Sequence, residues 1–330
     1  MSATRVVFTG KQQVQLEPFE PGPVGEGQIL IRTLYTLMST GTENIVFNRL
    51  FDPGTGWHDW VKYPFYPGYS TIGEIVEIGP GVENRSVGQR VTARLPHASH
   101  HVAAAAETVV VPDGISSSDA AWFALAKIAF MGAKVSDYHL GDSLLVIGAG
   151  PIGQMTVRWA SAAGLAHIIV VDPVATRLTF ALAGGATAVI NKPVTECKDD
   201  VLAAMGGTLP RIVNDSTGNA AVFAAALGLA DQRGRVVILG DTGTPAGQHL
   251  THDVIGRGLT IVGAHDGHND AQWDNSTISE FFFKLAGRGK FDLSGLNTHF
   301  FKPQDVEQAY QTVNTKRGET MGVVFDWTEA

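Results

Sequence analysis

Three glycines in the segment LLVIGAGPIGQMTVRWASAAG, at Gly148, Gly150 and Gly153, have the spacing of a phosphate-binding turn. The first glycine permits the tight turn, the second lets the backbone approach a pyrophosphate, and the third lets the following helix pack closely on the strand. The N-terminus of that helix offers N–H groups and a positive dipole end to an anion. Because an apolar strand precedes the glycines and the strand HIIVVD follows the helix, the segment predicts a dinucleotide site.

The acid at the end of that second strand, Asp172, indicates which dinucleotide binds. A carboxylate there accepts hydrogen bonds from the adenine-ribose hydroxyls and repels a 2′-phosphate, so NAD is favoured over NADP. Arg177 follows closely enough to bind a phosphate, and a solvated helix position is its alternative. The segments NDSTGN at 214–219 and ILGDTG at 238–243 follow later strands, at the edge where parallel sheets bind ligands. The predicted cofactor contacts are Gly148, Gly150, Pro151, Ile152, Gly153, Asp172, Arg177, Ser216 and Gly240.

A cluster of histidines, His97, His100 and His101, could bind a metal because imidazole is a common ligand. The spacing matches no zinc motif, and no carboxylate or cysteine accompanies the cluster before Glu107. We therefore favour substrate binding or proton transfer by these histidines, and we expect no metal. The segment WHDW at 57–60 offers aromatic faces and polar edges that suit a sugar or cyclic polyol, or it packs as a lid.

Two regions of different hydrophobic pattern must position these groups. Up to about Gly114, short apolar runs with period-two alternation are separated by Gly and Pro, which is typical of an antiparallel β-rich domain. From Asp119 onward, continuously apolar strands alternate with helices, which favours a parallel sheet covered on both faces and an α/β class. Beyond about His265 the alternation fades, and we expect the tail to return to the first domain. The predicted division is 1–124, 125–265 and 266–330.

Composition excludes several classes of partner. The chain has 24 Lys and Arg against 32 Asp and Glu, a net charge of −8, and no basic stripe, so nucleic acid is not expected as a partner. No segment has the length and apolar character of a signal peptide or a membrane span, and we expect a cytoplasmic protein that acts on a small molecule. The single cysteine, Cys197, excludes an internal disulfide and a cysteine zinc cluster.

The β-rich region, the GAGPIG turn near the middle of the chain and the segment GPGVENRSVGQRV at 79–91 resemble the zinc-type medium-chain dehydrogenases over essentially the whole chain. The resemblance implies a GroES-like catalytic domain, a Rossmann domain with a doubly wound parallel sheet, and a homodimer or homotetramer. Within that family, STGTE at 39–43 and PGYS with GEIVEIG at 67–79 are most similar to the bacteriochlorophyllide a dehydrogenase branch. That branch lacks the metal signature and oxidises a secondary hydroxyl. The resemblance therefore implies the same type of reaction for this chain.

The zinc-ligand positions of the family hold other residues in this chain. Thr40 stands at the usual cysteine, Tyr69 at the usual histidine, and Phe123 or Ala124 near the third ligand. A catalytic zinc normally keeps three protein ligands of His, Cys or carboxylate type. The resemblance therefore implies an enzyme that works without zinc.

Without zinc, another group must take the alcohol proton or hold the developing negative charge. Lys127 falls about one helical turn beyond the lost third ligand, where the family has a small residue touching substrate or nicotinamide; snorkelling to solvent is its alternative. Tyr69 is expected to point into the same cleft and to pass a proton, or else to pack. Thr42 matches the hydroxyl that relays the alcohol proton in the zinc enzymes. We expect catalytic work from Lys127, Tyr69, Thr42 and His97, and substrate contacts from Thr40, Glu43, Trp57, His100 and His101.

The sequence thus predicts zinc-independent, NAD-dependent oxidation of a secondary alcohol, on a sugar, glycoside or cyclitol ring. Two alternatives stay open. A zinc-free quinone or enone reductase needs no group to hold an alkoxide but usually uses NADPH, against which Asp172 argues. A non-catalytic redox sensor would keep the fold and bind NAD without turning over an alcohol.

Overall fold

The computed structural model describes residues 3–329, and the outer ends of the predicted segments 1–124 and 266–330 lie outside the described residues. The chain forms two compact units. Unit 1 consists of Met1–Ala124, Ala271–Gly287 and Ser294–Ala330, and unit 2 of Leu125–Asp270 and Arg288–Leu293. Residues 266–270 and 288–293, which the prediction placed in the returning segment, therefore belong to unit 2. The assignment of functions to the domains stays a prediction.

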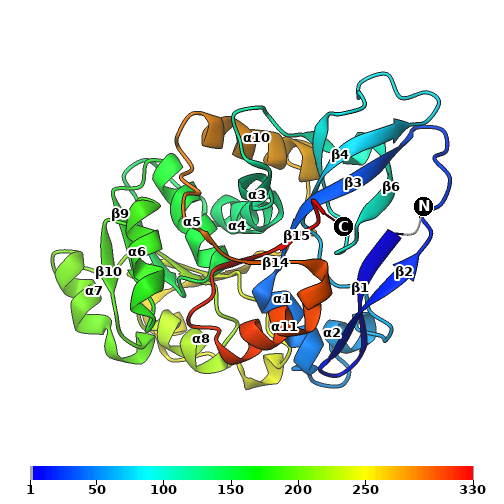
Figure 1. Cartoon of the computed structure of the whole chain (residues 1–330). Coiled ribbons are helices and arrows are strands. Elements are labelled where there is room, and N and C mark those ends of the chain that lie inside the picture. Colours follow the sequence, from blue (N-terminus) through cyan, green and yellow to red (C-terminus); the bar gives the residue numbers. More distant parts are fainter. Residues whose placement is uncertain (1–2, 330) are drawn as a thin grey trace. The chain divides into compact units, whose positions relative to one another are not determined.

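A parallel sheet of six strands forms the centre of unit 2 (Figure 1). Its strand order is β10-β9-β8-β11-β12-β13, so the chain winds outward from β8 in one direction and then returns to continue from β11 in the other. This order confirms the predicted doubly wound sheet. The strands are β8 (Ser143–Ile147), β9 (His167–Val171), β10 (Ala188–Ile190), β11 (Ile212–Asp215), β12 (Arg235–Ile238) and β13 (Thr260–Gly263).

The strand β8 is continuously apolar because both of its faces are buried. Leu144 and Val146 pack in one cluster with residues of α5 and α6, whereas Leu145 and Ile147 pack in another with residues of α7 and α8. Alternate side chains of a strand point to opposite faces, so helices cover both sides of this sheet. The helices are α4 (Phe123–Ser136), which starts in unit 1, α5 (Pro151–Ala162), α6 (Ala175–Ala183), α7 (Lys198–Ala204), α8 (Ala220–Leu227) and α9 (Asp253–Arg257), with short 3-10 helices η2 (Val194–Glu196) and η3 (Pro245–Gly247).

Unit 1 is built mainly on antiparallel strands. A hairpin joins β1 (Ala3–Gly10) to β2 (Gln13–Phe19). The larger sheet has the order β14-β15-β3-β4-β5-β7, with β6 also paired to β3. Its strands are β3 (Gln28–Leu37), β4 (Thr71–Ile78), β5 (Arg90–Ala93), β6 (His100–Ala104), β7 (Val109–Val110), β14 (Asn297–Phe301) and β15 (Gly322–Asp326). The helices are α1 (Thr40–Asn48), α2 (Gly56–Trp60), α3 (Ser117–Ala120), α10 (Asn275–Gly287) and α11 (Val306–Thr315), with η1 (Ala105–Glu107) and η4 (Pro303–Asp305).

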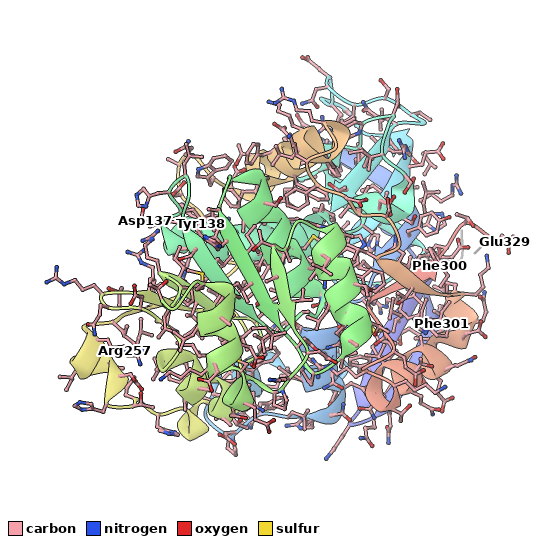
Figure 2. All side chains as sticks on the ribbon, turned by 90° about the vertical axis from the view of Figure 1, so that its left-hand side faces the viewer. Asp137, Tyr138, Arg257, Phe300, Phe301 and Glu329 are labelled. Carbon is pink, nitrogen blue, oxygen red and sulfur yellow. The ribbon has the colours of Figure 1, made fainter. Side chains whose placement is uncertain are left out.

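The last segment of the chain completes the sheet of unit 1. Strand β15 lies between β14 and β3, and its pairing with β3 is antiparallel. At the edge strand β14, Phe300 is 53% exposed (Figure 2). Lys302 Nζ lies 3.0 Å from a carboxylate oxygen of Asp326 and 3.0 Å from one of Glu329. These ion pairs fasten the end of the chain to the segment that follows β14.

Within residues 3–329, none of the helices has both the length and the apolar character that a membrane span requires.

Candidate active site

Hydroxyl groups from two segments of unit 1 meet at the start of helix α1. The Tyr69 phenol, just before β4, donates a short hydrogen bond to Ser39 Oγ, and Thr42 Oγ1 lies 3.5 Å from the phenol oxygen. The Arg94 guanidinium lies 4.9 Å from the centre of the Tyr69 ring, on the side of its negative π face. The structure thus brings together two predicted catalytic residues, Tyr69 and Thr42, with a serine that was not predicted.

The environment of Tyr69 keeps its phenol protonated. Burial raises the pKa of Tyr69, and the hydrogen bonds between the phenol and Ser39 and Thr42 and the positive charge of Arg94 offset this only in part. The negative charge of Glu43 raises the pKa further. Because the ordinary pKa of tyrosine is near 10, the phenol is neutral at physiological pH and serves as a hydrogen-bond donor.

Glu43 is a buried carboxylate that accepts hydrogen bonds from three directions. Its side chain is 2% exposed. Oε1 accepts from the Ser39 backbone N–H at 2.7 Å, and Oε2 accepts from the Tyr310 hydroxyl at 2.5 Å. His97 Nε2 lies 3.2 Å from the same Oε2. Protein groups therefore occupy both oxygens of Glu43, and its predicted contact with substrate stays a prediction.

The imidazole of His97 is completely buried and is held at both nitrogens. Its Nδ1 lies 2.7 Å from Thr36 Oγ1, and the Trp327 indole N–H donates to the same hydroxyl oxygen at 3.0 Å. Gly68 has a φ of +94°, and a Cβ at that position would lie 2.8 Å from the His97 ring. Glycine is thus required at position 68 both by the left-handed backbone and by the imidazole beside it.

The other two histidines of the cluster have different surroundings. His100 and His101 lie on β6, which pairs with β3, and both are buried. His100 Nδ1 lies 3.1 Å from Ser99 Oγ, whereas His101 Nε2 has no hydrogen-bond partner. Trp57 packs against Trp60 in α2, with ring centres 5.6 Å apart. Substrate contacts by these residues stay a prediction.

The buried His101 should make unit 1 sensitive to acid. Burial lowers its pKa from 6.5 to about 4, so the unfolded chain binds this proton more readily than the folded chain. The part of the unfolding free energy that depends on neutral His101 is therefore fully present above pH 6.5. It is lost as the pH falls from 6.5 towards 4, by up to about 3 kcal/mol. We expect His101→Phe to reduce this loss in urea unfolding curves at pH 7 and pH 4.5. The exposed His249→Asn variant should unfold like the wild type, and an unchanged pH dependence in His101→Phe would show that His101 is not responsible.

Lys127 lies in unit 2, in the buried part of α4, where its side chain is 2% exposed. Its ammonium nitrogen lies 2.7 Å from Asp266 Oδ1 and also contacts the Asp266 backbone carbonyl. On the same helix, Lys134 forms an ion pair with Asp270. The alternative of a lysine that snorkels to solvent is wrong, because a loop carboxylate folds over Lys127.

The glycine-rich turn between β8 and α5 has the predicted local geometry. Gly148 has a φ of +90°, and a Cβ on Gly153 would lie 1.9 Å from the Gly148 carbonyl oxygen. Gly150 is the N-cap of helix α5, and Pro151 is the first residue of the helix. The first-turn N–H groups of a helix have no intrahelical acceptor, so those of Ile152 and its neighbours are available to an anion.

Asp172 stands beside this turn, as predicted for a ribose-binding acid. Its Oδ2 accepts the Ala149 N–H at 2.7 Å, and its Oδ1 accepts the Val174 N–H at 2.8 Å. Arg177 Nη1 lies 3.9 Å from Asp172 Oδ2. A carboxylate that accepts two hydrogen bonds keeps further lone pairs for hydroxyl groups.

Gly240, after β12, packs against the loop that follows β11, and its predicted cofactor contact stays a prediction. A Cβ on Gly240 would lie 2.4 Å from the Gly218 nitrogen and 2.5 Å from the Thr217 nitrogen. Glycine is therefore needed here for close packing of the protein backbone itself. Ser216 donates to Asn214 Oδ1 at 3.0 Å. Asp215, which was not predicted, is fully buried and shapes this loop by accepting from Thr217.

Several functional candidates were missed from the sequence. Tyr310 and Trp327 reach Glu43 and Thr36 across 267 and 291 residues of chain, and no local pattern carries such pairings. Asp266 lies in the segment GAHDGHND. Because a buried lysine needs an opposite charge, the carboxylates of this segment could have been predicted as partners of Lys127.

Comparison with known proteins agrees with this architecture. Residues 25–117 match the alcohol dehydrogenase GroES-like domain, and residues 151–282 match the zinc-binding dehydrogenase family. An L-threonine 3-dehydrogenase of Vibrio parahaemolyticus is 27% identical over 355 residues, which covers 96% of each chain.

Solved structures share the fold over nearly the full length. An oxidoreductase/dehydrogenase of unknown specificity from Escherichia coli superposes with a TM-score of 0.84 at 20% identity, covering 99% of both chains. A 2R,3R-butanediol dehydrogenase from Bacillus subtilis superposes with a TM-score of 0.82 at 18% identity, covering 98% of this chain and 99% of the other. The predicted combination of a GroES-like domain and a Rossmann sheet is confirmed. The two family matches, which together take in more than half of the chain, and the relatives that align from end to end place this protein in the medium-chain dehydrogenase/reductase superfamily, as an oxidoreductase of the alcohol dehydrogenase type.

Proposed function

We propose that this enzyme is a zinc-independent, NAD-dependent dehydrogenase that oxidises a secondary alcohol on a sugar, glycoside or cyclitol ring. We place it in the zinc-lacking branch that resembles bacteriochlorophyllide a dehydrogenase. The observation that carries the proposal is Tyr69, a neutral phenol hydrogen-bonded to Ser39 where the zinc enzymes have a metal ligand. The names of the threonine and butanediol dehydrogenases, which denote hydroxyl-bearing small molecules, support an alcohol substrate.

The residues of this chain do not fit the zinc that the family name implies. Thr40 and Tyr69 offer only hydroxyl oxygens, and Phe123 and Ala124 offer no donor atom. Within residues 3–329, no three His, Cys, Asp or Glu side chains gather so that they could hold a metal ion. A catalytic zinc normally requires three such ligands, so we assign no step to a metal.

The residues around the α5 N-terminus fit a dinucleotide. A Cβ added to Gly150 would meet no atom closer than 4.0 Å, which leaves the approach to the helix N-terminus open for a pyrophosphate. Asp172 would hold the ribose hydroxyls, and Arg177 beside it would limit the repulsion of nearby phosphate. NAD, when bound, supplies the acceptor for the hydride.

The proton transfer is assigned to the predicted catalytic residues. In the oxidation, the neutral amine of Lys127 accepts the alcohol proton as hydride leaves the carbon, and Asp266 holds the ammonium group that results. The Tyr69 hydroxyl, kept neutral by burial, has a single hydrogen, which turns from Ser39 Oγ to the alcohol oxygen as negative charge develops there. Thr42 supports the phenol from the side of α1. His97, fully buried, acts without touching the substrate.

A substrate screen with metal control tests the proposal. The purified enzyme, dialysed against a chelator and checked by elemental analysis, is assayed for NAD reduction with cyclitols, sugars, methyl glycosides, L-threonine and 2,3-butanediol. We expect full turnover with less than about 0.1 zinc per chain and the highest kcat/KM on a ring alcohol. Turnover that disappears on chelation and returns with zinc would disprove zinc independence. Binding of NAD with no turnover of any alcohol would point to a redox sensor.

A further inference from the structure

Glu43 and His97 form a buried pair next to the residues that hold Tyr69. A carboxylate that is 2% exposed is costly unless hydrogen bonds or an opposite charge compensate it. Glu43 receives the Ser39 N–H, the Tyr310 hydroxyl and the His97 imidazole. The bond from the Ser39 N–H caps the first turn of α1, but that cap needs neither the Tyr310 hydroxyl nor the His97 imidazole, so these two partners of the carboxylate call for another explanation.

The hydrogen positions around His97 follow from its neighbours. The Trp327 indole can only donate, so one lone pair of Thr36 Oγ1 accepts from it at 3.0 Å. The Thr36 hydroxyl hydrogen is then free to point at His97 Nδ1, 2.7 Å away. This leaves a hydrogen on His97 Nε2, which faces Glu43 Oε2 at 3.2 Å. The chain of donors therefore runs from Trp327 through Thr36 and His97 to the carboxylate.

Both members of the pair contact the immediate supports of Tyr69. Glu43 holds the backbone N–H of Ser39, and Ser39 Oγ is the acceptor for the Tyr69 hydroxyl. The His97 ring occupies the space that a side chain at position 68 would need, directly before Tyr69 in the chain. The pair thus fixes the partner of the phenol on one side and its backbone on the other.

We propose that Glu43 and His97 act as a positioning pair that sets the orientation and the proton affinity of the Tyr69 phenol. The proposal rests on the role given to Tyr69 in the proposed function. In this role both residues act through Tyr69 and its supports. The titratable and charged groups that face the pair are Tyr310 from α11, Tyr69 from the segment before β4, His101 from β6 and Arg94 directly after β5, the last acting through the Tyr69 ring. The negative charge of Glu43 raises the pKa of Tyr69.

A titration that needs no substrate tests the link to Tyr69. The chain has six tyrosines, so protein labelled with ¹³C at the tyrosine ζ carbon should give few signals, and Tyr69→Phe identifies the one of interest. We expect Glu43→Gln to lower the pKa of Tyr69, because a negative charge beside the phenol is removed. The matched change Glu307→Gln, exposed on α11, should leave the Tyr69 signal unchanged. A Tyr69 signal that titrates identically in wild type and Glu43→Gln would overturn the proposal.

A double-mutant cycle tests the same link in catalysis. With the alcohol selected by the substrate screen, we expect Glu43→Gln to lower kcat about tenfold in the wild-type background and less than twofold when Tyr69→Phe is already present. Equal losses in both backgrounds would show that the pair does not act through Tyr69. If Tyr69→Phe itself keeps full turnover, the role of Tyr69 in the proposed function is wrong. The titration then tests by itself whether Glu43 and His97 act on the Tyr69 phenol.

A second variant covers the case in which Glu43→Gln does not fold. His97→Gln leaves Glu43 its hydrogen bonds from Ser39 and Tyr310 and takes the place of Glu43→Gln in the cycle. The expected result is the same non-additivity with Tyr69→Phe, with the KM for NAD unchanged because NAD is assigned to unit 2. Additive losses would again count against the proposal.

Discussion

Replacement of Lys127 by methionine is expected to lower kcat at least about 100-fold, because general acid–base catalysis typically contributes that much or more. Methionine keeps most of the side-chain volume in the buried part of α4 but removes the ammonium that Asp266 holds at 2.7 Å. Asp266 is partly exposed, so water can solvate its carboxylate in the variant. Steady-state kinetics, together with thermal unfolding and NAD binding, separates a loss of chemistry from a loss of structure.

The same helix supplies a matched control for this prediction. Lys134 also forms an ion pair with an aspartate of the following loop, Asp270, but its side chain is 30% exposed. Lys134→Met should therefore keep kcat within about twofold, since an exposed ion pair contributes little. Comparable activity in the two variants would exclude Lys127 from the reaction.

Replacement of Asp172 by serine is expected to change the cofactor preference. The variant loses a charged acceptor for the ribose hydroxyls, and a hydrogen bond to a charged group contributes about 1.5–3 kcal/mol. This corresponds to a fall of about 10- to 100-fold in kcat/KM for NAD. The value for NADP should rise, because the repulsion of its 2′-phosphate is removed while Arg177, 3.9 Å from the carboxylate in the native protein, remains to bind that phosphate. Initial rates with both cofactors measure the ratio.

Two further variants make the cofactor result interpretable. Arg177→Ala in the Asp172→Ser background should remove the gain with NADP, whereas Asp199→Ser, at an exposed position of α7, should behave like the wild type. A wild-type enzyme that already prefers NADP would contradict the role of Asp172.

The Rossmann unit could be predicted because its signals are local. Strands such as SLLVI are apolar throughout because both of their faces are buried. The glycine spacing is set by contacts between residues close in sequence, such as Gly153 against the Gly148 carbonyl. The surroundings of Gly240 do not follow from such local signals. A glycine after a strand is equally consistent with an approaching ligand and with an approaching loop, and only the fold brings Thr217 and Gly218 against it.

The support of the site could not be predicted, because it is made of contacts between distant segments. The sequence indicated Tyr69 and Thr42 through their positions in a motif, and the structure brings them together. Glu43 has a partner in α11 and His97 has one in β3, whose Thr36 in turn accepts from Trp327 after β15, and no periodicity links these segments. Lys127 was identified as a buried lysine, but its ion pair with Asp266 depends on how a loop folds over α4.

The strand that completes the sheet of unit 1 also determines when the site can form during synthesis. The ribosome releases β3, α1 and the Tyr69 segment early, whereas Tyr310 and Trp327 come from the last part of the chain, with β15 between them. Until those residues emerge, Glu43 and Thr36 lack the two donors that reach them from the C-terminal segment. A nascent chain can therefore build the dinucleotide turn of unit 2 while the hydrogen bonds behind Tyr69 are still incomplete.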